Sequence, residues 1–127
     1  MTQSIEALTT GALSLALSAA GQRHQALAAN LANATAEGYT PVRLAFEASL
    51  ADARQSLRER GSVDAQGLAA ARIEIEPDVD ASGQAAPVQV DAAMVELARN
   101  AVHYQALTQG LSRHLGIHAM AAADGRR

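Results

Sequence analysis

Two histidines in this sequence have a spacing that could serve metal chemistry. His114 and His118 are four positions apart, so a helix would project both imidazoles from one face, as in a two-histidine metal pair. A zinc site needs at least one more protein ligand, but the chain contains no cysteine and Asp124 falls in a polar tail. We therefore interpret the pair as the polar end of a helical seam, and we expect no metal ion or other cofactor.

The other residues capable of chemistry lack the neighbours that catalysis requires. His24 lies in an apolar stripe and His103 stands beside Tyr104, but there is no GxSxG nucleophile motif, no GxGxxG, no Walker loop and no paired-carboxylate motif. The densest basic run, RQSLRER at 54–60, is typical of a solvated helix face, and no basic stripe points to nucleic acid. We predict that the protein is not an enzyme and does not bind nucleic acid.

The composition indicates one helical domain with a thin core. Of the 127 residues 49% are hydrophobic, but alanine makes up the largest share of these and only 2% are aromatic; the formal net charge is −3. Alanine is the strongest helix former but buries little area, and apolar burial contributes roughly 25 cal/mol per Å². We expect residues 1–127 to form a single domain that partner molecules complete.

Residues 4–33 are predicted to form a first long helix. The segment has no proline, Ser4 is a suitable N-cap, and apolar residues recur at heptad spacing along two neighbouring stripes. The stripes are Ile5, Leu8, Ala12, Leu15 and Ala19, and then Leu13, Leu17, Ala20, His24, Leu27 and Leu31. Because one hairpin partner covers only one stripe, we expect a further contact. The apolar stretch at 11–20 is too short to span a bilayer and follows no basic residue, so we expect neither membrane insertion nor a cleaved signal peptide.

Residues 90–120 are predicted to form a second long helix. Its apolar positions step by four and three as a heptad seam over four repeats, made of Val90, Met94, Leu97, Ala101, Tyr104, Thr108, Leu111, Leu115 and His118. Asp91 near the start, and Arg113 and His114 toward the end, are expected to complement the helix dipole.

The middle of the chain, residues 34–89, has a different character. The first helix should stop at Asn33, because Gly38 supplies a left-handed residue and Pro41 blocks continuation. The expected elements beyond it are a short helix at 46–60, one strand without a partner at 72–76 (RIEIE) and a loop at 77–87. We predict a mostly α fold, with the two terminal heptad helices packed as an antiparallel hairpin or coiled coil and a mobile middle segment.

The end of the first helix carries a recognisable motif. The stretch ANLANATAEGY at 29–39 resembles the N-terminal signature of bacterial flagellar axial proteins, which runs approximately A-x-N-I/L-A-N-x-x-T-P/E-G-Y. The matching residues are Asn30, Leu31, Ala32, Asn33, Gly38 and Tyr39. The threonine is displaced to Thr35, and Glu37 stands where proline is frequent.

The second helix carries a separate resemblance. VQVDAAMVELARNAVHYQALTQGLSRHL at 88–115 is similar to the end of the FlgB family of proximal rod proteins, on whose pattern Met94, Leu97, Ala98, Asn100, Tyr104 and Gln105 fall. Gln89 and Ala93 replace two acidic residues of the family pattern. The two motifs lie at the two ends and cover roughly half the chain.

The resemblance implies a structural subunit of the flagellar basal-body rod. Such a subunit is exported by the flagellar type III apparatus without a cleaved signal and polymerises in the periplasm to transmit torque. The implied partners are copies of itself, other rod subunits, and the MS-ring and export-gate proteins. The residues expected to pack in the assembly are Leu27, Asn30, Leu31, Asn33, Gly38, Tyr39, Met94, Leu97, Asn100, Tyr104, Leu111 and Leu115.

Other interpretations of the same sequence stay open. A cytoplasmic coiled-coil adaptor or chaperone-like protein predicts a stable, discrete dimer. Another rod protein of the same superfamily is a second possibility, and a histidine–metal protein is a third, which predicts measurable zinc affinity.

Overall fold

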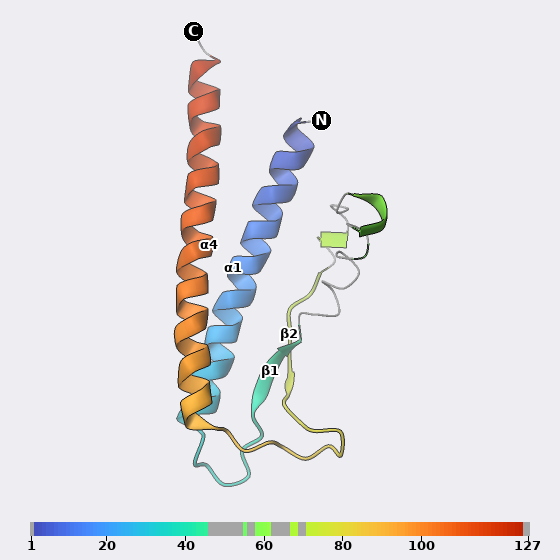
Figure 1. The fold of residues 1–127 in the computed structure, drawn as a ribbon, viewed down its shortest axis with the longest axis vertical. Coiled ribbons are helices and arrows are strands. Elements are labelled where there is room, and N and C mark those ends of the chain that lie inside the picture. The colour runs from blue at the N-terminus through green and yellow to red at the C-terminus, as the bar shows by residue number, and fades with distance from the viewer. Residues whose placement is uncertain (1, 46–54, 56–57, 62–66, 69–70, 126–127) are drawn as a thin grey trace.

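Two long antiparallel helices dominate the computed structural model, which describes residues 2–45, 55, 58–61, 67–68 and 71–125. Helix α1 (Thr2–Ala32) and helix α4 (Val90–Asp124) have 31 and 35 residues, so they are about 46 and 52 Å long at 1.5 Å per residue. Figure 1 shows both termini at one end of this pair, here called the open end, and the turn that follows α1 at the other, closed end. The predicted mostly helical hairpin is confirmed.

Both helices lie close to their predicted bounds, and the largest difference is at the C-terminal end of α4. Helix α1 begins two residues before the expected cap Ser4 and ends one residue before Asn33, which is within the usual fraying of helix ends. Helix α4 begins after Gln89, with Asp91 in its first turn as expected, and continues one turn past 120 through a run of alanines. The expected dipole role of Arg113 and His114 is therefore wrong, because dipole effects are confined to the last turn and that turn holds no basic residue.

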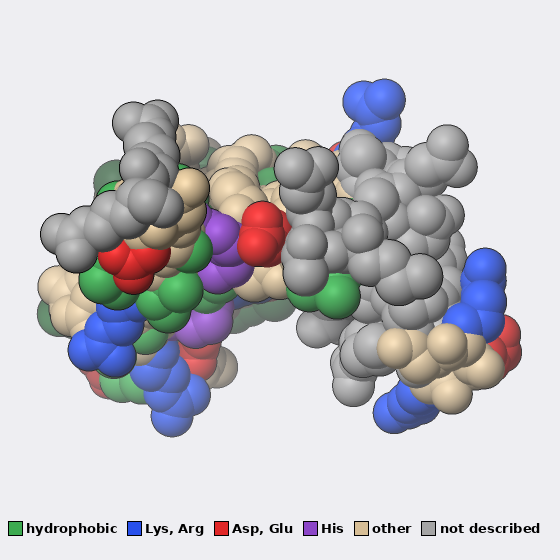
Figure 2. All heavy atoms as spheres, turned by 90° about the horizontal axis from the view of Figure 1, so that it is seen from above, with side chains coloured by type: hydrophobic (Ala, Val, Ile, Leu, Met, Phe, Trp, Pro, Cys, Tyr) green, Lys and Arg blue, Asp and Glu red, His purple; other side chains and the backbone are tan. Residues whose placement is uncertain are grey.

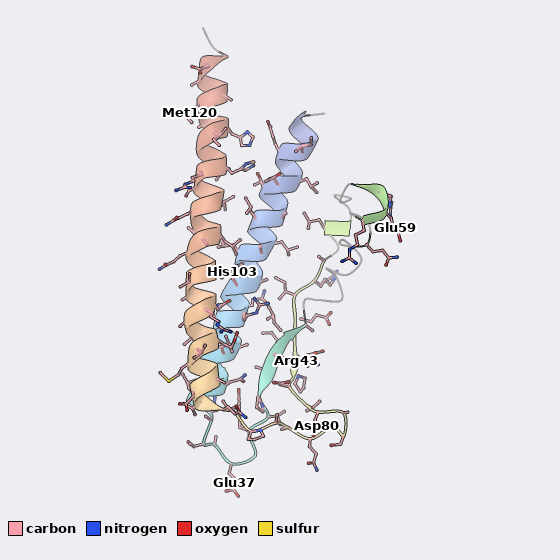
Figure 3. The ribbon with its side chains drawn as sticks, in the orientation of Figure 1. Glu37, Arg43, Glu59, Asp80, His103 and Met120 are labelled. Atoms are coloured by element: carbon pink, nitrogen blue, oxygen red, sulfur yellow. The ribbon has the colours of Figure 1, made fainter. Side chains whose placement is uncertain are left out.

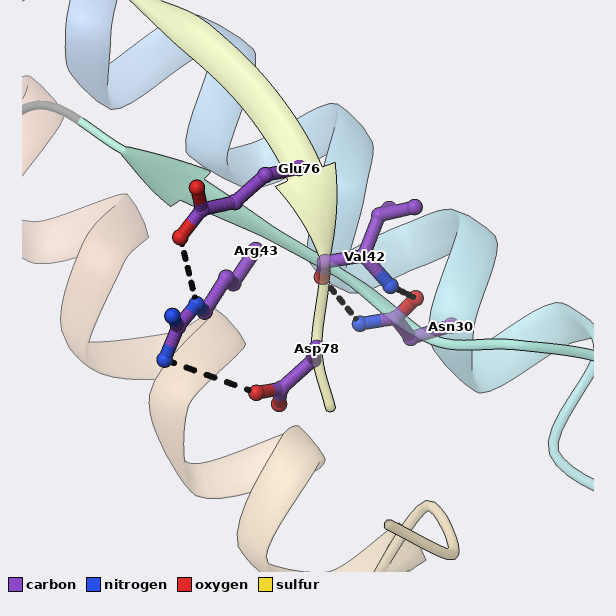
Figure 4. Close-up of polar contacts among 5 residues, drawn as sticks. All are labelled: Asn30, Val42, Arg43, Glu76 and Asp78. Atoms are coloured by element: carbon purple, nitrogen blue, oxygen red, sulfur yellow. Dashed lines mark hydrogen bonds and ion pairs between the residues drawn. The ribbon is translucent and has the colours of Figure 1, made fainter. Parts of the chain in front are cut away.

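A small antiparallel sheet lies beside α1. Strand β1 (Val42–Ala45) pairs with β2 (Glu74–Pro77), and Arg43 faces Glu76 across the two strands. The Arg43 Nε lies 2.8 Å from Glu76 Oε1, and its Nη1 lies 3.8 Å from Asp78 Oδ1 (Figure 4). The predicted strand exists, but it begins two residues later and ends one residue later than expected. The expectation that it has no partner is wrong, because the segment directly after Pro41 pairs with it.

The rest of the middle segment is described in part. The predicted helix at 46–60 lies mostly outside the described residues, although residues 55 and 58–60 are helical. Gly61 has a φ of 66°, which suits the break expected there. The predicted loop includes an isolated bridge between Val79 and Ala85, which closes a turn around Asp80. The predicted mobility of the middle segment stays a prediction.

Small side chains fill the space between the elements. Among the described residues, the buried hydrophobic ones are Ala19, Ala20 and Ala26, and no bulky side chain is completely buried. The protein exposes 9222 Å², whereas a compact protein of 13.1 kDa exposes roughly 6400 Å². The predicted thin core is therefore observed in the part of the chain that the structure describes. No helix in that part has an apolar stretch long enough to cross a bilayer.

Candidate assembly site: the Asn30 cluster and the uncovered faces of α4

The chain reverses direction directly after α1, at the closed end of the hairpin. The N–H of Ala36 donates to the Asn33 carbonyl at 2.9 Å, and the N–H of Tyr39 donates to the Ala36 carbonyl at 3.3 Å. Gly38 has a φ of 74°, the left-handed conformation that glycine adopts without strain. Glu37 projects from the tip of this turn (Figure 3). The turn brings the chain back against α1 as β1 begins.

Asn30, Tyr39 and Val42 form a hydrogen-bonded group, here called the Asn30 cluster. The Asn30 amide Nδ2 donates to the Val42 carbonyl at 2.8 Å, and the Val42 N–H donates to Asn30 Oδ1 at 2.9 Å (Figure 4). The Tyr39 hydroxyl donates to the same Oδ1 at 3.0 Å. Asn30 is only 8% exposed, so these bonds are shielded from water. The cluster fixes the angle at which β1 leaves the helix.

Asn33, the second asparagine of the motif, makes a local hydrogen bond. Its Nδ2 donates to the carbonyl of Ala29, one turn back on α1, at 2.8 Å. Asn30 and Asn33 thus both bond to backbone groups near the helix end. Only Asn30 reaches another element, however. Leu27 and Leu31, on the same turns of α1, are half-buried.

On α4 the structure buries a face that overlaps only partly with the predicted seam. Leu97, Ala101, Leu111 and His118 are at least half-buried, as the seam requires. By contrast, Met94, Tyr104 and Leu115 are 56%, 42% and 50% exposed. The covered face is rotated toward Ala93, Leu97, Asn100, Leu107, Leu111, His114 and His118. That face follows heptad steps too, and the side chains of α1 determine which of the two is covered.

The rotation has a polar cause near the middle of the helix pair. Asn100 is 4% exposed and donates from Nδ2 to the Ala20 carbonyl of α1 at 2.8 Å. Ala19 and Ala20 are small enough to let the two backbones approach at this point. The Oδ1 atom of Asn100 is buried and has no hydrogen-bond partner in the described part of the chain. Asn100 thus ties one face of α4 to α1 and borders a groove of about 380 Å³, lined by Gly21, His24, Gln25, Asn100, Ala101, Tyr104 and Gln105.

Large hydrophobic side chains remain uncovered along the whole length of α4. They are Val90, Met94, Val95, Val102, Tyr104, Leu115, Ile117 and Met120, with exposed fractions from 42% to 67%. Met120 stands near the open end, far from the closing turn (Figure 3). Viewed from above, hydrophobic side chains lie open on the surface among arginines and acids (Figure 2). Exposed apolar surface of this extent is typical of a protein-binding surface.

The histidines of α4 occupy the open end of the pair. His114 and His118 contact each other through their Nε2 atoms at 3.1 Å, and His118 Nδ1 lies 3.6 Å from Glu6 Oε1 on α1. The described residues contain no group of three or more His, Cys, Asp or Glu side chains that could hold a metal ion. His24 lines the groove beside Asn100, and His103 lines a second groove with Ala19.

Sequence reasoning missed two partners that the structure supplies. The backbone of Val42 completes the Asn30 cluster, and Glu6 of α1 approaches His118 of α4. The alternation VRLA, directly after Pro41, was the one signal for the strand that holds Val42. Nothing local in the sequence indicates the approach of Glu6, which is 112 positions from His118.

No protein-family model matches the chain, and no curated protein matches it. The site therefore has to be interpreted from its own geometry: a hydrogen-bonded closed end, a helix pair with a thin alanine contact, and uncovered apolar faces on the longer helix.

Proposed function

We propose that this chain is a structural subunit of the bacterial flagellar rod, of the FlgB type, which polymerises through its terminal helices to transmit torque. The observation that carries the proposal is the uncovered apolar surface of α4. Eight large hydrophobic side chains are exposed along that helix, from Val90 to Met120, although α1 packs against it over much of its length. A helix of this kind needs further neighbours on other faces.

The energetics favour association with several neighbours over a stable monomer. Complete burial of one Val, Leu, Ile or Met side chain contributes roughly 1.5–3 kcal/mol. Where α1 meets α4, the fully buried residues are small alanines and Asn100, which contribute much less apolar area. Docking of neighbouring helices against α4 would therefore add more apolar burial than the monomer contains in its own helix contact.

The motifs at the two ends support the rod over other assemblies. ANLANATAEGY resembles the signature of flagellar axial proteins, and the Asn30 cluster gives its asparagine and tyrosine a physical role at the helix end. The stretch at 88–115 resembles the FlgB family, and its Asn100 is the residue that joins α4 to α1. On this proposal the subunit acts in the periplasm after type III export. Its partners are other rod subunits, copies of itself, and the MS-ring and export-gate proteins.

Tagged protein in purified basal bodies tests the proposal. The chain is expressed with an internal tag near Ser82, an exposed residue of the turn at Asp80, in a strain that lacks its own copy. The tagged protein should restore motility, and electron microscopy with gold-labelled antibody should locate the tag in the rod. A cytoplasmic coiled-coil adaptor, the competing function, predicts a discrete dimer in light scattering and no label in basal bodies. That result would overturn the rod proposal.

A further inference from the structure

The two histidines at the open end, His114 and His118, form a close pair. Their Nε2 atoms are 3.1 Å apart and their rings meet edge to face at 83°, with centroids separated by 4.4 Å. Two imidazole nitrogens at zinc–nitrogen distances of 2.0–2.1 Å and a tetrahedral angle are separated by about 3.3 Å. The two Nε2 atoms share a hydrogen bond at nearly this separation, so an ion bound between them would replace the proton of that bond.

The carboxylate on α1 adds a second, independent feature. Glu6 Oε1 lies 3.6 Å from the other ring nitrogen of His118, Nδ1. A carboxylate at that position favours a proton on Nδ1, which makes Nε2 of His118 the acceptor in its hydrogen bond with His114. A carboxylate behind the far ring nitrogen is also the arrangement found at many metal-binding histidines. Because Glu6 comes from α1, the histidine is oriented from outside its own helix.

The site is open to solvent and incomplete. The side chain of His118 is 31% exposed and that of Glu6 is 47% exposed. Viewed from above, histidine side chains lie beside hydrophobic and acidic ones on this face (Figure 2). No third ligand completes the pair among the described residues, so its remaining coordination positions are left to water or to the same pair of a second protomer.

We propose that His114 and His118 bind one divalent ion of the zinc, nickel or copper type, with Glu6 as the positioning residue. Imidazole is a preferred ligand of these ions, and copper should bind most tightly. The ion would join successive turns of α4 and, through Glu6, hold α1 at the open end. This inference does not rest on the rod proposal, because a chain with any function would carry the same three side chains.

Calorimetric titration of Zn²⁺ into the metal-free, full-length protein tests the inference. We expect saturable binding of one ion per chain, or of one ion per two chains if a second pair completes the coordination. His118→Ala and His114→Ala should each abolish that binding. His103→Ala is the matched control, since it removes a histidine from the same helix outside the pair, and it should bind zinc as the unmodified protein does.

The positioning role of Glu6 has its own readout. Glu6→Gln should weaken zinc binding by about tenfold, which is typical for loss of an outer carboxylate, while helix content measured by circular dichroism stays unchanged. Unchanged zinc affinity in Glu6→Gln would remove Glu6 from the proposal. Absence of saturable binding, or equal binding by the His114→Ala/His118→Ala double variant and the unmodified protein, would overturn the site altogether. Helix content of every variant separates loss of a ligand from loss of the fold.

Discussion

The side chain of Asn30 pairs with the backbone of Val42 as one strand pairs with another. It donates from Nδ2 to the Val42 carbonyl at 2.8 Å and accepts the Val42 N–H at Oδ1 at 2.9 Å. Asparagine is suited to this position because its short side chain ends in one donor and one acceptor group. Aspartate could not donate, and leucine could make neither bond. The helix thereby holds the first residue of β1 in place.

Loss of the Asn30 side chain should therefore destabilise the closed end. Asn30→Ala leaves the Val42 N–H and carbonyl, and the Tyr39 hydroxyl, without their partner in a shielded position. We expect the free energy of unfolding to fall by about 2 kcal/mol, measured by urea denaturation followed by circular dichroism. Asn33→Ala is the control: the Asn33 side chain donates to the Ala29 carbonyl one turn back, and its loss should cost less than about 1 kcal/mol. Equal losses in the two variants would contradict the role given to Asn30.

The buried amide of Asn100 allows an isosteric test with a pH readout. Asn100→Asp keeps the shape but replaces the donor to the Ala20 carbonyl with a carboxylate oxygen. At neutral pH a buried charge would face an acceptor, and we expect a loss of about 3 kcal/mol in the free energy of unfolding. Burial raises the pKa of such a carboxyl, so the protonated form, which can donate, stabilises the fold at low pH. That stabilisation is complete below the unfolded pKa and disappears as pH rises through the folded pKa.

Thermal unfolding of Asn100→Asp, measured from neutral to acidic pH, tests this prediction. The melting temperature of the variant, relative to the unmodified protein at the same pH, should recover as the solution is acidified. A deficit independent of pH would show that the contact to Ala20 is not what Asn100 contributes.

The two faces of α4 should respond differently to charge. Leu111 lies on the face covered by α1, so Leu111→Asp should lower the free energy of unfolding of the isolated chain by about 2 kcal/mol. Val102 is 67% exposed, and Val102→Glu should change the free energy of unfolding by less than about 0.5 kcal/mol. On the rod proposal, however, Val102→Glu should block assembly into basal bodies. Arg99→Gln, an exposed change one turn away, should assemble normally. Normal assembly of Val102→Glu would remove that residue from the interface.

The turn at Asp80 should show a titration that depends on one hydroxyl. The Ser82 hydroxyl, at 2.6 Å, and then the N–H groups of Gln84 and Ser82 hold the pKa of Asp80 below its ordinary value. These bonds contribute to the order of the turn above the unfolded pKa, and their contribution disappears as pH falls through the lowered folded pKa. Ser82→Ala should move the pKa of Asp80 upward, toward its ordinary value, in an NMR titration of the carboxyl carbon. An unchanged titration would contradict the assignment of the main cause to Ser82.

Helix periodicity predicted that α4 exists but could not determine which face it buries. This helix carries hydrophobic residues on several faces. A seam through Met94 and Leu115 therefore fits the heptad pattern as well as one through Leu107 and His114 does. Leu97 and Leu111 belong to both faces and were placed correctly. The small side chains of α1 and the contact of Asn100 with Ala20 decide between the two faces, and both are tertiary features.

The residues of the candidate site could be predicted from the sequence, but the groups that they contact could not. The motif at the end of α1 identified Asn30 and Tyr39, and the turn at Gly38 followed from glycine's conformational freedom. The pairing of β1 with β2 joins segments about thirty residues apart, and four-residue strands carry too little alternation to reveal it. The opposite charges of Arg43 and Glu76 were a weak signal for that register.

The alanine contact between α1 and α4 also shapes how the protein responds to heat. Unfolding exposes apolar surface in proportion to what the fold had buried, and the heat capacity change follows that surface. With alanines as its buried hydrophobic residues in the described part, the isolated chain should show a heat capacity change below the usual 12–15 cal/mol/K per residue. Its stability curve would be flat, with a gradual thermal transition and a shallow dependence on denaturant. Steep, cooperative melting would then be a property of the assembled state, acquired as neighbouring helices cover α4.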